Sequence, residues 1–122
     1  MPSTLVRPES KSLGTPDRVK TFPKAKIEFI EVGGKTLARA TLQLGWRWST
    51  SIKPIVNTDS CESSHFQYLI SGSMIVELDD GTRIECKAGD VSLIPPGHDA
   101  WVVGKEPAVA LDFEGLADFA KL

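Results

Sequence analysis

Histidine and cysteine are the residues of this 122-residue chain best suited to hold a metal ion, and the chain has two of each. His65 and His98 are the histidines, and Cys61 lies four residues before His65. A thiolate with two imidazoles suits Zn²⁺ and can also hold Fe²⁺, Ni²⁺ or Cu²⁺. On an extended strand Cys61 and His65 would lie about 13 Å apart, so they can share a metal only if residues 62–64 form a turn. The alternative is that both histidines are hydrogen-bonded residues of a pocket without metal.

The two thiols have different surroundings in the sequence. Cys86 alternates with Ile84 opposite charged neighbours, which predicts a small core side chain. Cys61 has acidic neighbours, Asp59 and Glu62, and negative charge raises the pKa of a thiol. We therefore expect Cys61 to be a poor nucleophile unless a metal ion or a protonated histidine lies beside it.

Aromatic and amide side chains close to these residues are candidates for contacting a ligand. The candidates are Gln67, Tyr68, Trp48 and Trp101. Trp46 and Trp48 alternate, so we expect them on one face of a strand with Arg47 opposite. For Trp46 a core position is favoured, whereas for Trp48 a pocket wall and a packing position both remain open.

The elements that must position these residues are short strands. Eight or nine stretches rich in β-branched and aromatic residues follow one another between Lys26 and Phe113, separated by Gly, Pro and Asp turns. This pattern is typical of an all-β sandwich or barrel. An immunoglobulin-like sandwich is the weaker interpretation, because no tryptophan lies between Cys61 and Cys86.

Two domain-level regions are expected. Residues 1–25 contain four prolines and no hydrophobic period, which predicts an irregular N-terminal arm, and residues 26–122 form the β domain. Leu116, Phe119 and Ala120 recur at i, i+3 and i+4 and predict a short C-terminal helix.

Net charge, targeting signals and the number of cysteines indicate which partners and which compartment to expect. The formal net charge is −2, and residues 36–122 hold seven basic and twelve acidic side chains, so a nucleic-acid partner is not expected. The start of the chain lacks the apolar core of an export signal, and no apolar run is long enough to cross a bilayer. We therefore expect a cytoplasmic protein with reduced cysteines and no membrane partner.

Two segments resemble the motifs of the cupin superfamily. Gly89-Asp-Val-Ser-Leu-Ile-Pro-Pro-Gly97 is similar to the start of the second cupin motif, and His65 precedes Gly72 by the spacing at which the first motif places a glutamate before its closing glycine. The resemblance extends over residues 35–113, and Pro95–Trp101 is similar to the same region of a small single-domain subgroup. It implies an antiparallel jelly-roll barrel, a double-stranded β-helix, with a ligand site in its mouth.

The metal ligands implied by the resemblance depart from the usual three histidines and one glutamate. Asp59 and Cys61 stand at two histidine positions, His65 stands at the glutamate position, and Ala100 stands where the second motif has its histidine. A metal site would therefore be rebuilt from Cys61, His65 and His98, with Asp59 or Gln67 as a candidate further ligand and Zn²⁺ or Fe²⁺ as the ion.

The resemblance implies a barrel that binds a small polar ligand in its interior through a divalent metal. Two classes of function remain open: a metal-dependent enzyme (dioxygenase, isomerase or lyase) and a non-catalytic binding or sensing module without metal. The incomplete ligand set and the lack of paired carboxylates favour the second class. A third class is an assembly protein whose Pro-rich arm is exchanged between the subunits of a homodimer.

Overall fold

A computed structural model of the chain describes residues 7–114. In this range the chain forms nine strands and two single-turn helices. The strands are β1 (Arg18–Phe22), β2 (Ala25–Val32), β3 (Lys35–Leu42), β4 (His65–Ser71), β5 (Ser73–Leu78), β6 (Arg83–Lys87), β7 (Val91–Ile94), β8 (His98–Val103) and β9 (Ala108–Asp112), and the helices are α1 (Trp48–Ser51) and α2 (Lys53–Val56). None of the described helices has the length or apolar character that crossing a membrane requires.

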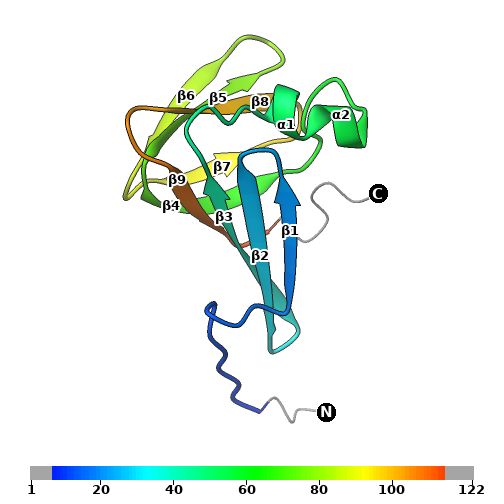
Figure 1. Cartoon of the computed structure of the whole chain (residues 1–122), viewed down its shortest axis with the longest axis vertical. Helices are drawn as coiled ribbons and strands as arrows, with labels where there is room; N and C mark the ends of the chain where they lie inside the picture. Colours follow the sequence, from blue (N-terminus) through cyan, green and yellow to red (C-terminus); the bar gives the residue numbers. More distant parts are fainter. Residues whose placement is uncertain (1–6, 115–122) are drawn as a thin grey trace.

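The strands form two antiparallel sheets, which confirms the expected all-β class. One sheet has six strands in the order β1-β2-β3-β9-β4-β7, and the other has three in the order β6-β5-β8 (Figure 1). The strands that carry the site alternate between an inner and an outer face: on β4, for example, His65, Gln67 and Leu69 are buried while Phe66 and Tyr68 are exposed. The inner faces of both sheets contribute to one hydrophobic core.

The closed jelly-roll barrel implied by the resemblance is not formed. The hydrogen-bonded ladders of the two sheets do not join in the described range, and outside them the chain makes only two isolated bridges, Arg47 with Trp101 and Cys61 with His98. The arrangement is therefore two separate sheets, and the two bridges join residues outside the strands, Arg47 and Cys61, to β8 of the small sheet. Both bridges lie on β8, beside the residues that carry the site.

The expected irregular arm of residues 1–25 is corrected over Arg18–Phe22, which form β1, whereas residues 7–17 form neither helix nor strand. Arg18 to Phe22 pair antiparallel with Phe29 to Ala25 of β2. The Asp17 carboxylate also accepts a hydrogen bond from the Glu31 backbone N–H at 2.8 Å. A strand at the edge of a sheet is held by backbone bonds, so it needs no hydrophobic period of its own. The expected C-terminal helix lies outside the described residues.

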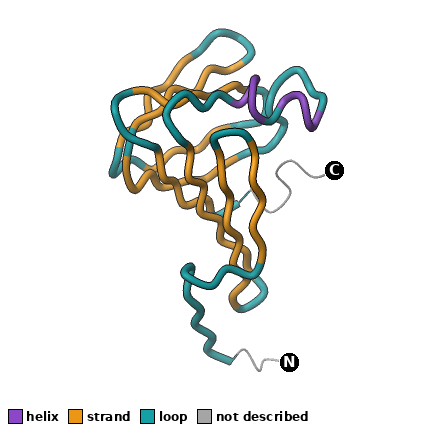
Figure 2. The backbone as a smooth tube through the Cα atoms, in the orientation of Figure 1, coloured by secondary structure: helices purple, strands orange, loops and turns teal. Residues whose placement is uncertain are grey.

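The tryptophan segment is not a strand, contrary to the expectation. After Trp46 the chain turns into the two short helices α1 and α2, drawn in purple in Figure 2, and α1 packs against β8. Pro54 occupies the first turn of α2, where its missing N–H costs nothing, and Asn57 ends that helix in the left-handed conformation. The turn buries Trp46 and Trp48 against the core instead of aligning them on a strand face.

Gly72, between β4 and β5, is required by a close approach to the last strand. Its φ of +81° lies in the left-handed region, and a Cβ there would meet the Pro107 carbonyl oxygen at 2.3 Å. We expect Gly72→Ala to lower the free energy of unfolding by about 3 kcal/mol or more, because conformational strain and a backbone clash add.

Gly81 is the matched control for that variant. Its φ is +90°, but a Cβ there would meet no atom within 4 Å. Gly81→Ala should cost about 1–2 kcal/mol, the strain alone. Urea unfolding of both variants measures the difference in the free energy of unfolding. Equal decreases in the two variants would show that the close approach of Pro107 to Gly72 does not add to the cost.

Candidate metal centre

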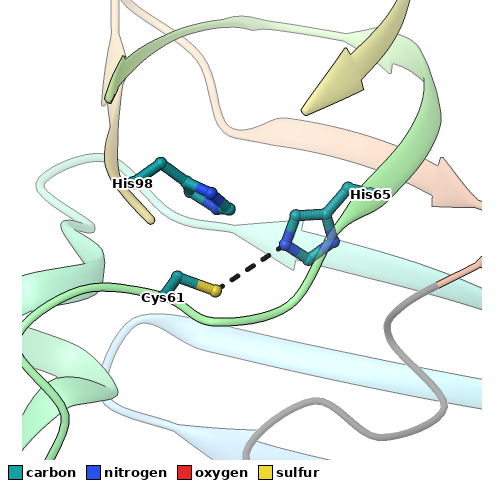
Figure 3. A group of neighbouring side chains, drawn as sticks. All are labelled: Cys61, His65 and His98. Atoms are coloured by element: carbon teal, nitrogen blue, oxygen red, sulfur yellow. Dashed lines mark hydrogen bonds between the residues drawn. The ribbon is translucent and has the colours of Figure 1, made fainter. Parts of the chain in front are cut away.

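Three segments bring Cys61, His65 and His98 together (Figure 3). His65 and His98 are the first residues of β4 and β8, and Cys61 lies in the loop before β4. The Cys61 N–H donates to the His98 carbonyl at 2.7 Å, and the Gly97 N–H donates to the Cys61 carbonyl at 2.7 Å. Two of the three side chains are therefore fixed relative to each other by the backbone.

The three side chains lie close enough to share one ion. Their ligand atoms all lie within 4.8 Å of one another, and the Cys61 Sγ is 3.8 Å from the His65 Nε2. The two imidazole rings meet edge to face, with centroids 5.2 Å apart. All three residues are buried. The turn expected at residues 62–64 is not formed: these residues have no turn, helix or strand, and the side chains of Cys61 and His65 meet across this irregular loop.

Hydrogen bonds orient both histidines for metal binding. The His65 Nδ1 lies 2.6 Å from an Asp112 carboxylate oxygen, and the His98 Nδ1 lies 2.8 Å from the Pro95 carbonyl oxygen. Since both partners are acceptors, Nδ1 carries the proton in each ring and Nε2 remains for a metal. A carboxylate or carbonyl behind each histidine is the arrangement found around protein-bound zinc. The donor set fits Zn²⁺ with three protein ligands and one further position.

The cluster shifts the protonation of its own members. Burial alone would raise the pKa of the Cys61 thiol, but hydrogen bonds and charge from His65 and His98 outweigh it and lower that pKa to about 6. Burial would lower the pKa of His65, but the hydrogen bond to Asp112 and the bond to Cys61 raise it to about 9. Without metal at neutral pH, the pair is therefore a thiolate beside an imidazolium. The acidic neighbours in the sequence do not govern the Cys61 thiol, because His65 lies beside it.

The cluster opens on a cavity between the two sheets. The empty space there is about 570 Å³, a volume that includes the part open to solvent. Of the four expected ligand contacts, Gln67 and Trp48 line this cavity. The Asp99 carboxylate holds Trp48 in place: it accepts from the Arg47 Nε and the Ser49 N–H, each at 3.1 Å, and so ties α1 to β8.

The other two expected contacts, Tyr68 and Trp101, do not line the cavity. Tyr68 lies on the exposed face of β4 because it is one residue out of phase with Gln67. Trp101 is one residue out of phase with buried Ala100, and the guanidinium of Arg47 covers its ring at 4.3 Å. The sequence placed both near the motifs, but strand alternation directs them outward.

Asp112 is a site residue that the sequence analysis missed, and Trp46, which occupies the favoured core position, lines the cavity as well. Asp112 continues the inward alternation of the alanines at 108 and 110 on β9. A carboxylate at an inward position of a strand was the sequence feature that could have identified it as a site residue. It pairs in register with Gln67, two residues from His65 on β4. Trp46 lines the cavity, and its buried indole N–H has no hydrogen-bond partner among the described residues.

Comparison with known proteins supports the fold. No family model matches the chain, and no curated protein matches it by sequence. Among solved structures, a protein of unknown function (DUF1255) from Acidithiobacillus ferrooxidans superposes with a TM-score of 0.60 at 15% identity, covering 91% of this chain and 97% of that one. A cupin-like protein from Thermotoga maritima gives 0.53 at 14% identity, covering 92% and 80%.

A mutant of Bacillus subtilis oxalate decarboxylase gives a TM-score of 0.53 at 23% identity, covering 81% of this chain but 28% of that protein. Sequence identities this low show a similar fold but not a shared ligand or activity. The chain therefore has a cupin-like fold that contains a possible Cys/His metal site.

Proposed function

We propose that this protein binds one divalent first-row metal ion, Zn²⁺ foremost, through Cys61, His65 and His98, and binds a small molecule with a polar head group next to it. The observation that carries the proposal is the convergence of three buried ligand atoms within 4.8 Å, each on a backbone-anchored residue. Three protein ligands leave a position for a ligand atom, as in catalytic zinc sites. A bound metal would supply Lewis acidity there.

An enzymatic role would be that of a metal-dependent dioxygenase, isomerase or lyase. In such a role Asp112 would keep the His65 Nε2 directed at the metal, and the buried position of the cluster would exclude bulk water from the head group. The ligand would be held by the cavity wall that includes Trp48 and Gln67.

Metal analysis of protein purified without a metal-binding tag tests the proposal. Near-stoichiometric Zn²⁺, or stoichiometric uptake of Zn²⁺, Fe²⁺, Ni²⁺ or Cu²⁺ on dialysis, would support it. A protein that retains none of these ions would overturn it.

A metal-free binding or sensing module is the second candidate, and one observation favours it. The polar groups of the cluster satisfy one another without an ion: His65 bonds Asp112 and Cys61, and His98 bonds Pro95. In that case the histidines would be hydrogen-bonding groups of the pocket. The metal analysis above separates the two candidates.

Asp112→Asn should weaken metal binding about 10- to 100-fold while leaving the three ligands in place, because loss of a carboxylate behind a histidine ligand has that typical cost. The amide is a weaker acceptor for the His65 Nδ1 proton, so the imidazole becomes a poorer donor to the metal. Competition against a coloured chelator measures the affinity. Asp90→Asn, a change at an exposed position next to a turn, is the control. An equal loss of metal affinity in this control would contradict a specific role of Asp112 in metal binding.

A further inference from the structure

The walls of the cavity beyond the metal cluster are almost entirely carbon. Its polar side chains are those of the cluster, Asp112, Gln67 and the two tryptophans, Trp46 and Trp48, each with one indole N–H, and no lysine or arginine lines it within the described range. The remaining walls are aliphatic, aromatic or thioether groups, among them Ile27, Ile52 and Val76. A polar body would lose its hydration here without finding new hydrogen bonds. The walls therefore favour an apolar ligand body.

Alanines on both sheets create the space. Ala40 on β3 and Ala110 on β9 are register partners in the large sheet, and Ala100 lies on β8 of the small sheet. All three are buried and line the cavity. Facing sheets lie about 10 Å apart, a gap that large side chains normally fill. A methyl group on each side leaves room for a ring-sized group.

The Trp46 indole N–H, which has no acceptor within the described part of the chain, points independently to a ligand. Trp46 is 5% exposed, and a buried donor left without an acceptor costs about 1–3 kcal/mol. An acceptor on a bound molecule would satisfy this donor. Because no lysine or arginine of residues 7–114 lines the cavity, a metal ion at the cluster is the positive group that an anionic head group could bind.

We propose that the ligand is a compact molecule with a ring-sized, largely apolar body and a single anionic oxygen head group that binds the metal. The body lies between Ala40 and Ala110 on one side and Ala100 on the other. The ligand class deepens the proposed function and rests on it, because the head group needs the ion at Cys61, His65 and His98.

Two hydroxamates that share one head group test the ligand class. Benzohydroxamate carries a phenyl ring, acetohydroxamate carries a methyl group, and both are titrated into Zn²⁺-loaded protein by calorimetry and tryptophan fluorescence. We expect benzohydroxamate to bind at least about 30-fold more tightly, since the ring leaves water for an apolar wall. Equal affinities, or tighter binding of acetohydroxamate, would overturn the ligand class and leave the metal site standing.

A cavity-filling variant locates the ring. Ala100→Leu should reduce the preference for benzohydroxamate to less than about threefold, because the added carbons occupy the ring space. Ala110→Val is the second variant if the first fails to fold. Ala88→Leu, in an exposed turn, is the control and should retain the full preference. A folded cavity variant with the full preference would place the ring elsewhere and overturn the proposal.

The metal content of each sample separates the two levels of inference. Zn²⁺ stoichiometry is measured on the same protein before titration. Protein that takes up no metal would overturn both the proposed function and the ligand class, whereas metal-loaded protein without a ring preference would overturn the ligand class alone.

Discussion

His98→Ala should lose most of the metal that the wild-type protein binds, with a fall in affinity of more than about 100-fold. Changes behind a ligand already cost up to about that much, and this variant removes a ligand itself. The two remaining ligands, Cys61 and His65, form a poor site. His98 begins β8 and contacts Cys61 through backbone bonds that alanine retains, so the strand should survive the change.

Zinc content after dialysis and chelator competition measure this loss, and Cys86→Ala is the control. Cys86 is the other thiol, buried beside Ser92 with its Sγ 3.3 Å from the serine Oγ. Because Cys86 belongs to the core, its replacement should cost stability and leave the metal content unchanged. Full metal content in His98→Ala would contradict the proposed ligand set. Loss of metal in Cys86→Ala would contradict the assignment of that thiol to the core.

Much of the fold could be predicted because its strands alternate and its turns are marked by glycine. The hairpin at Gly33-Gly34 and the turn at Asp80-Gly81 occur where their residues predict them, with positive φ at each glycine. Cys86 is buried, as predicted, but Ile84, expected on the same face, is exposed. The strand β1 could not be predicted, since its Arg18–Phe22 sequence has little apolar character and its order comes from pairing with β2.

The candidate site could be predicted in part. The resemblance named Cys61, His65 and His98, and the structure brings them together through the Cys61–His98 bridge. Asp112 lies 47 residues from His65 along the chain, and only the pairing of β9 with β4 brings them together. Long-range strand pairing is the information that local patterns lack. Tyr68 and Trp101 are a different case, because local alternation already places Tyr68 opposite Gln67 and Trp101 opposite Ala100, and their nearness to the motifs along the chain says nothing of the face they occupy.

Proton release should make metal affinity strongly dependent on pH. Metal binding requires a Cys61 thiolate and a neutral His65. The raised pKa of His65, about 9, means that its proton stays until high pH and must be displaced by the metal. Between about pH 6 and pH 9 one proton is thus released per ion, and affinity should rise about tenfold per pH unit. Below about pH 6 the Cys61 thiol also holds a proton, so affinity should fall about a hundredfold per unit.

The state of the metal-free thiol gives the sharpest readout of this linkage. We expect the ultraviolet absorbance of a thiolate to appear with a midpoint at about pH 6, because His65 and His98 stabilise the charged sulfur of Cys61 more than burial opposes it. Burial raises the pKa of Cys86, so the signal from that thiol should appear only at higher pH than that of an ordinary cysteine. Cys61→Ser should remove the early signal and leave the late one. Two results would show that His65 and Cys61 do not form an ion pair: an early signal that survives this substitution, or thiolate absorbance that first appears near pH 9. In either case the hundredfold-per-unit loss of metal affinity would have to begin well above pH 6.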